Sequence, residues 1–136
     1  MTTTTTNATL TLSAIDQIGL GCTDLDAAQR FYSDVLGLPL ADDIPSMAKL
    51  FACGGVNLIV FKGETVPPGS IVYFKVEGVA GRIQEAVERL KAAGVKIEKE
   101  PQCIAKNWHG NDVYLAFFKD PFGNMLALKS DVPTSS

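Results

Sequence analysis

The sequence has few of the residues that mark several large classes of protein. It contains a single histidine, a single tryptophan and three cysteines in 136 residues. The cysteines are odd in number and widely spaced, at Cys22, Cys53 and Cys103. This pattern favours reduced thiols over a disulfide framework, and the spacing does not match that of metal sites. We therefore expect a protein of a reducing compartment, the cytoplasm.

Clusters of positive charge and long apolar runs are also missing. The formal net charge is -3, and no basic run is present of the kind that binds phosphate backbones, so we expect no nucleic-acid partner. No apolar stretch approaches the length of a membrane span, and the threonine-rich start does not have the form of a secretory signal. We expect no membrane partner. A hydrophobic content of 46% instead indicates one ordinary globular domain.

The stretch from Ile15 to Leu40 predicts a strand, a helix and a second strand. Thr23 and Asp26 have the spacing of a capping box at the start of a helix, and Gly37 follows the last apolar residue, where a glycine can end the helix. Between them, apolar residues recur every three or four positions, so one side of the helix must cover something. These residues are Leu25, Ala28, Phe31, Tyr32, Val35 and Leu36.

The same order of elements occurs twice. Three short strands are expected after the first helix, at 38–44, 47–53 and 56–61. Beyond a proline- and glycine-rich linker at 63–69, the pattern predicts a strand at 70–77, a helix ended by Gly94, and strands at 95–105 (interrupted by Pro101), 112–118 and 124–129. The sequence therefore predicts an α+β domain over 14–130, with modules at 14–62 and 70–130 and loose tails at 1–13 and 131–136.

Alternation along the strands separates two faces, because successive side chains of a strand point to opposite sides. One set is apolar and is expected beneath the helices: Ile18, Leu20, Leu58, Val60, Val72, Phe74, Val76, Leu126 and Leu128. The other set is mixed: Gln17, Gly19, Asn57, Ile59, Phe61, Ile71, Tyr73, Lys75, Met125, Ala127 and Lys129. Such a mixture indicates a cavity lining or a wetted surface.

Two segments carry a family resemblance, DLDAAQRFYSDVLGL at 24–38 and FKDPFGNMLALK at 118–129. With the repeated order of elements, they make the chain similar to the vicinal oxygen chelate superfamily, which includes glyoxalase I, extradiol dioxygenases, and fosfomycin and bleomycin resistance proteins. The resemblance implies two βαβββ modules forming a cupped, eight-stranded mixed sheet with the helices outside. It also implies a homodimer formed through the first helix and the sheet edges, with Phe31 or Tyr32 at the interface.

Catalytic members of that superfamily hold one divalent metal in the cup. The resemblance places the four ligand positions at Gln17, Ile59, Ile71 and Ala127. Only Gln17 carries a donor, and a single neutral amide cannot replace the water shell of a divalent ion. We therefore expect an apolar cup with no metal and no other cofactor. The alternative is one divalent metal held by donors from elsewhere, such as His109 with Asp112 or Asn57.

Several side chains have a functional and a structural interpretation. Gln17 either orients a ligand or is satisfied by neighbouring backbone, and Tyr73 and Lys75 either fix an anionic or carbonyl group or extend into solvent. His109 is either a general base or a surface residue, and Trp108 beside it would stack on a planar ligand if the loop overhangs the cup. The expected ligand-binding residues are Gln17, Asn57, Ile59, Phe61, Ile71, Tyr73, Lys75, Trp108, His109 and Ala127.

Two functional hypotheses follow. The first is a binding protein, similar to the bleomycin resistance proteins, that holds a small organic molecule in a metal-free cup. Lys75 and Lys129 argue against a cationic drug as that molecule, because a cation favours acidic walls. The second is a metal-dependent glyoxalase-type lyase, isomerase or dioxygenase, for which the sequence identifies no catalytic residue.

Overall fold

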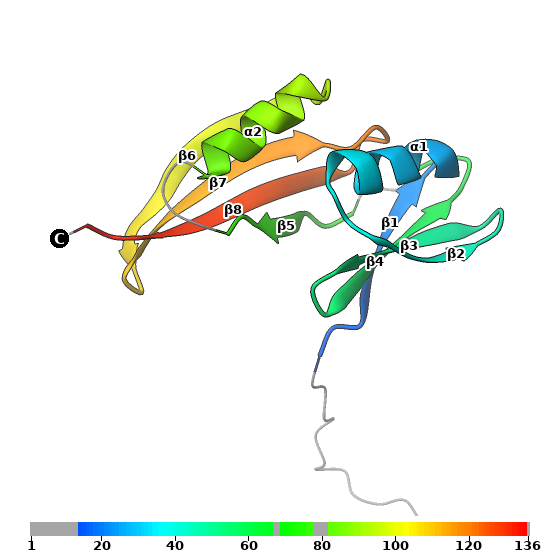
Figure 1. Ribbon diagram of the computed structural model, residues 1–136, viewed down its shortest axis with the longest axis horizontal. Coiled ribbons are helices and arrows are strands. Elements are labelled where there is room, and N and C mark those ends of the chain that lie inside the picture. The colour runs from blue at the N-terminus through cyan, green and yellow to red at the C-terminus, as the bar shows by residue number, and fades with distance from the viewer. Residues whose placement is uncertain (1–13, 67–68, 78–81, 136) are drawn as a thin grey trace, which may run out of the picture.

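The structure consists of two modules that lie side by side along its long axis (Figure 1). It is a computed structural model, and it describes residues 14–66, 69–77 and 82–135. The predicted N-terminal tail, two residues of the predicted linker and the expected first turn of the second helix lie outside the described residues. Among those described, no helix combines the length and apolar character needed to cross a membrane.

The first module contains a four-stranded sheet and one continuous helical segment. Its elements are β1 (Gln17–Cys22), α1 (Leu25–Gln29), a π-helix η1 (Arg30–Val35), β2 (Leu40–Ile44), β3 (Ala48–Cys53) and β4 (Val56–Lys62). The strand order is β1-β4-β3-β2, with β1 parallel to β4 and the other pairs antiparallel.

The second module repeats this topology with longer strands. Its elements are β5 (Val72–Lys75), α2 (Arg82–Ala92), β6 (Ile97–Trp108), β7 (Asn111–Lys119) and β8 (Met125–Pro133). The order β5-β8-β7-β6, with β5 parallel to β8, matches that of the first sheet. The predicted α+β class and the repeated βαβββ unit are therefore confirmed.

Two details of the predicted architecture need correction. The eight strands form two hydrogen-bonded sheets of four rather than one continuous sheet, and β1 and β5 are edge strands. The C-terminal tail expected from residue 131 is also wrong, because β8 continues to Pro133 and Thr134 donates its N–H to the carbonyl oxygen of Gly110. Both helices lie on the same side of the sheets (Figure 1).

The first helix begins and ends through local hydrogen bonds. The side chain of Asp24 accepts the N–H of Ala27 at 3.0 Å, so Asp24 is the N-cap and the predicted capping box of Thr23 with Asp26 is wrong by one residue. Gly37 ends the helix with φ of +80°, a left-handed conformation that glycine adopts without steric cost.

Pro101 does not interrupt its strand as the sequence predicted. β6 runs from Ile97 to Trp108, and its pairing with β7 shifts register between Lys99 and Gln102. A proline lacks the N–H needed for a regular ladder, but it is tolerated at a bulge on an edge strand, and β6 is an edge strand.

The two modules share one apolar core. It lies between the sheets and the helices and includes Leu20, Phe31, Tyr32, Phe51, Leu58, Val60, Val87, Phe118, Leu126 and Leu128. The rings of Phe31 and Phe118, one from each module, have centroids 6.5 Å apart. Phe31 and Tyr32 are buried, at 5% and 0% exposure, so the prediction that they form a dimer interface is wrong. Their aromatic surface is used within the chain.

A buried polar network also joins the modules. The Asp120 carboxylate accepts hydrogen bonds from the hydroxyl of Tyr32 at 2.7 Å and from the backbone and side chain of Asn124 at 2.8 and 2.7 Å. The Asn124 amide donates onward to the carbonyl oxygen of Gly21 at 2.8 Å. The turn between β7 and β8 is thus fixed to both β1 and the first helix.

Candidate functional site

The sheet surfaces turned away from the helices form the candidate site, which we call the open face. Strand alternation predicted this division: the apolar set lies in the core or packs against it. The opposite set contributes Gln17, Gly19, Asn57, Ile59 and Phe61 from the first sheet, and Ile71, Tyr73, Lys75, Ala127 and Lys129 from the second. All of these residues remain partly accessible except Ala127, which is fully buried.

On the first sheet, Gly19 allows an aromatic ring to lie across β1. A Cβ atom at Gly19 would lie 3.2 Å from Cε1 of Phe61 and 3.9 Å from Cγ2 of Ile59, so these residues share one surface. Phe61 nevertheless remains 44% exposed. Gln17 and Asn57 are register partners on the parallel strands β1 and β4, which places two amides beside this apolar surface.

On the second sheet, an aromatic pair lies beside two lysines. The rings of Tyr73 and Phe117 meet edge to face with centroids 6.2 Å apart, and half of the Tyr73 side chain is accessible. Lys75 forms an exposed ion pair with Glu77 at 3.7 Å. Lys129, its register partner, is held by Asp131 at 2.7 Å. Because carboxylates balance both lysines, the open face here has little net positive charge.

A pocket is formed by residues of β6, β7 and β8. It has a volume of about 290 Å³ and is lined by Ile104, Ala105, Trp108, Val113 and Lys129. Trp108 is 54% exposed and contacts the ring of His109 edge to face, with centroids 4.3 Å apart. Sequence reasoning identified Trp108 but missed the apolar residues Ile104, Ala105 and Val113. The irregular register between β6 and β7 hides the alternation that would have revealed them.

The turn between β6 and β7 lies at the outer end of the second module, away from the first sheet (Figure 1). Trp108 is the last residue of β6, and His109 follows it in this turn. His109 adopts a left-handed φ of +53° beside Gly110 at +83°. The predicted site residues are therefore divided: Gln17, Asn57, Ile59 and Phe61 lie on one sheet, and the others lie on the second sheet or its hairpin. The pocket at Trp108 contains no residue of the first sheet.

Asp112 stabilises this hairpin. Its Oδ1 atom accepts the backbone N–H of Asn107 at 2.9 Å and the hydroxyl of Thr134 at 2.7 Å. These hydrogen bonds, the one from Asn107 first, lower the pKa of the Asp112 carboxyl below its usual value. Asp112 is thus already used in holding the turn. Asn57, the other expected partner of His109, belongs to the first sheet.

The residues at the superfamily's metal positions do not fit a divalent ion. Ile59 is half-buried on β4, Ile71 precedes β5, and Ala127 is fully buried on β8. Gln17 alone offers an oxygen, and a divalent ion needs several oxygen or nitrogen donors to replace its water shell. Within the described part of the chain, no three His, Cys, Asp or Glu side chains are grouped closely enough to hold a metal.

Two four-stranded sheets of βαβββ topology with helices on one side define a known class of protein. The chain belongs to the Glyoxalase/Bleomycin resistance protein/Dioxygenase superfamily, whose family model matches residues 14–128. The resemblance seen in the sequence is therefore confirmed. No curated protein sequence matches the chain.

Solved structures show the same fold. A lactoylglutathione lyase from Agrobacterium tumefaciens is 26% identical, with a TM-score of 0.71 over 88% of this chain and 95% of that one. A fosfomycin resistance protein from Listeria monocytogenes is 19% identical, with a TM-score of 0.70 over 88% of this chain and 94% of that one. A superfamily protein from Nocardioides is 22% identical, with a TM-score of 0.69 over 91% and 87% of the two chains.

Proposed function

We propose that the protein binds a small organic molecule on the open face without a metal. The observation that carries this proposal is the apolar pocket at Trp108, which is about 290 Å³ in volume. Small-molecule sites are concave and mainly apolar, with a few polar groups that fix orientation. Trp108 provides an aromatic surface for stacking, and Lys129, held by Asp131, provides a fixed polar group at the edge of the pocket.

The character of the open face supports a neutral or weakly polar planar molecule. Phe61, Ile71 and Tyr73 are large apolar side chains that folding leaves 39–50% exposed. Apolar surface of this kind commonly marks a site of interaction. The nearby lysines already have carboxylate partners, so a strongly charged ligand would have to compete with Glu77 or Asp131 for them.

We also propose that two chains associate through sheet edges, as the resemblance implies. The edge strand β2 exposes Leu40 and Ile44, and Met47 follows in the turn to β3. Exposed apolar residues on an edge strand favour pairing with another chain. Light scattering should therefore give twice the mass of one chain, and Ile44→Lys should shift the population to monomers. A monomeric wild-type protein would contradict this part of the proposal.

Binding is tested by titrating isotopically labelled protein with coumarin, a neutral planar probe, and following backbone amide signals. Signals of Ala105, Trp108 and Val113 should move. Trp108→Ala should weaken binding about fivefold, because an aromatic stacking contact is worth about 1 kcal/mol. Ile15→Ala is the matched control: its side chain is also exposed, but it lies outside the pocket. Unchanged affinity in Trp108→Ala would overturn the proposed site.

The similarity to a lactoylglutathione lyase supports a second candidate, a metal-dependent lyase, isomerase or dioxygenase. It would need donors other than the residues at the superfamily's metal positions. Metal-dependent turnover that is lost in Gln17→Ala would favour this candidate. Turnover retained in that variant would exclude Gln17 from the metal site.

A further inference from the structure

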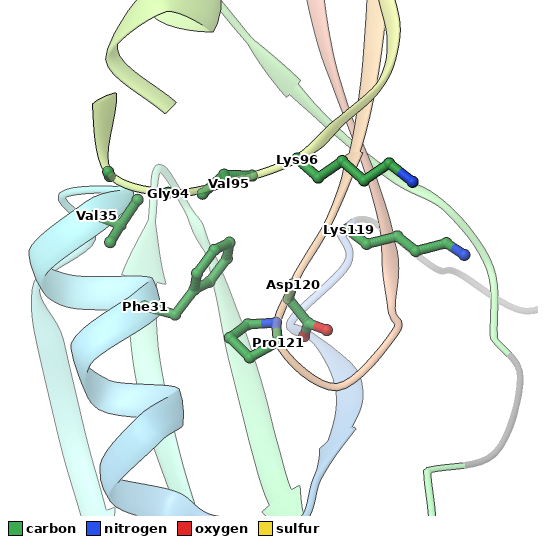
Figure 2. Close-up of a pocket in the computed structure, with 9 residues that line it drawn as sticks. Phe31, Val35, Gly94, Val95, Lys96, Lys119, Asp120 and Pro121 are labelled. Atoms are coloured by element: carbon green, nitrogen blue, oxygen red, sulfur yellow. The ribbon is translucent and has the colours of Figure 1, made fainter. Parts of the chain in front are cut away.

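A second pocket lies on the opposite side of the molecule, where the two modules meet beside the helices. It has a volume of about 320 Å³, and we call it the junction pocket. Phe31 and Val35 of η1 form one wall, and Val95 and Lys96 after α2 form another (Figure 2). Lys119 at the end of β7 and Pro121 in the turn that follows complete the pocket. It shares no lining residue with the pocket at Trp108.

The apolar wall of the junction pocket is continuous with the shared core. Phe31 is buried against Tyr32, with ring centroids 5.1 Å apart, and approaches Phe118 from the second module. It belongs to the π-helix, in which the N–H of Leu36 donates to the carbonyl oxygen of Phe31 at 2.9 Å. Such wide helical turns are rare and often occur at functional sites. Phe31 and Val35, on successive turns of this helical segment, line the cavity with apolar surface.

The polar groups inside the junction pocket are already satisfied. The Asp120 carboxylate accepts hydrogen bonds from Tyr32, Phe122 and Asn124, so little of its capacity remains for a ligand. Two carbonyl groups at the end of α2 accept hydrogen bonds from the turn at Gly94. The N–H of Gly94 donates to the carbonyl oxygen of Lys91, and the N–H of Val95 donates to that of Leu90, each at 2.9 Å. These bonds weaken the attraction of the helix end for a cation.

The junction pocket carries one net positive charge, because Lys96 and Lys119 lie at its rim and the Asp120 carboxylate lies in its lining. Lys96 and Lys119 extend in the same direction from neighbouring backbone segments (Figure 2). Within the described part of the chain, neither forms an ion pair, in contrast to Lys75, Lys91 and Lys129. Each ammonium group sits on a flexible four-carbon stem and can reorient over the rim. The pocket thus combines an apolar wall with two lysines that have no ion-pair partner among the described residues, beside a carboxylate that is already hydrogen-bonded.

We propose that the junction pocket binds a small carboxylate with an aromatic body. The ring would pack against Phe31, Val95 and Pro121, and the carboxylate would lie between Lys96 and Lys119. A cavity of about 320 Å³ is at the lower end of the range for ligand sites, which suits a body of one ring. Because both modules line the pocket, the ligand would add contacts between them and stabilise the folded chain.

Phenylacetate and its neutral isostere phenylacetamide test this proposal in amide-signal titrations of the labelled protein. Phenylacetate should move the signals of Gly94, Val95 and Lys96, and phenylacetamide should bind about fivefold more weakly. Lys96→Ala and Lys119→Ala should each weaken phenylacetate binding by about fivefold, the upper range for a partly exposed charge pair. Lys106→Ala, on β6 and outside the pocket, is the control and should leave the affinity unchanged.

Three results would overturn the proposal. They are equal affinity for the two probes, unchanged affinity in both lysine variants, and signal changes confined to the open face. Loss of folding would not be mistaken for loss of binding. Lys96 and Lys119 are exposed, so their substitution should leave the fold intact, and the comparison of the two probes uses the wild-type protein. The outcome is also independent of the open-face proposal, since signals of Val113 and Trp108 report that site separately.

Discussion

The two faces of the sheets differ in how far their side chains are buried, although the same strands contribute to both. On the face beneath the helices, Leu58, Val60 and Phe118 are almost completely buried, and Asp120 has hydrogen-bond partners from three residues. On the open face, Phe61 and Tyr73 are large, apolar and 44% and 50% exposed. Folding accounts for the first arrangement but not for the second. The proposed binding of a small molecule to the open face would account for this difference.

The largest expected effect is a difference in stability between substitutions on the two faces. Phe118→Ala should lower the free energy of unfolding by about 4 kcal/mol, because it leaves a cavity in the shared core. Phe61→Ala removes the same ring from the open face and should cost less than about 1 kcal/mol. Urea unfolding of both variants measures the difference. Similar losses in the two variants would show that the open face is part of the core.

The next effect tests the polar network between the modules. Asp120→Ala removes an acceptor from Tyr32 and Asn124 and leaves their buried donors unpaired, which should cost about 3 kcal/mol. Asp131→Ala, the matched control, breaks the more accessible ion pair with Lys129 and should cost less than about 1 kcal/mol. If Asp120→Ala cost no more than Asp131→Ala, the network would not be what joins the modules.

High pH should lower the free energy of unfolding through groups on the face beneath the helices. Burial first, and the neighbouring Asp120 carboxylate second, raise the pKa of the Tyr32 phenol above its usual value. A raised pKa means that folding favours the protonated form, so this stability is present below about pH 10 and is lost as the pH rises further. Burial also raises the pKa of the Cys22 thiol, so Cys22 adds a loss that begins at lower pH.

Tyr32→Phe separates the two contributions. It should be less stable than the wild type at pH 7, because the hydrogen bond to Asp120 is gone, but it should lose less stability between about pH 9 and pH 11. Unfolding in urea across this range measures both effects. An identical alkaline decline in the two proteins would mean that Tyr32 does not contribute.

The smallest expected effect is a gain. The Ser130 hydroxyl is buried on β8 and has no hydrogen-bond partner among the described residues. An unpaired buried hydroxyl is destabilising, so Ser130→Ala should stabilise the protein by up to about 1 kcal/mol. A small rise in thermal midpoint is the expected readout. A loss of stability would show that the hydroxyl has a partner.

Periodicity in the sequence predicted the fold well because it reflects which side chains are buried. Alternation along β1, β4, β5 and β8 assigned both faces, and Gly37 and Gly94 ended the helices as expected. Cooperative and long-range features were not predictable in this way. The hydrogen bond between Tyr32 and Asp120 spans 88 positions, and no local pattern reveals it.

The candidate site was only partly predictable for the same reason. Trp108 was identified because a single tryptophan in a polar loop is conspicuous, but its pocket partners lie where β6 shifts register. Register shifts exchange the faces of a strand, so alternation fails there. The junction pocket is assembled from three separate segments, and the sequence alone gave no sign of it.

The most direct test of a metal-free open face is the metal content of the protein. Protein purified without chelators or immobilised metal should contain far less than one metal ion per chain by elemental mass spectrometry, and its thermal midpoint should not respond to added Zn²⁺, Ni²⁺, Mn²⁺ or Fe²⁺. Nearly one ion per chain, with a stabilisation that a chelator reverses, would contradict this account and place the metal-dependent enzyme first.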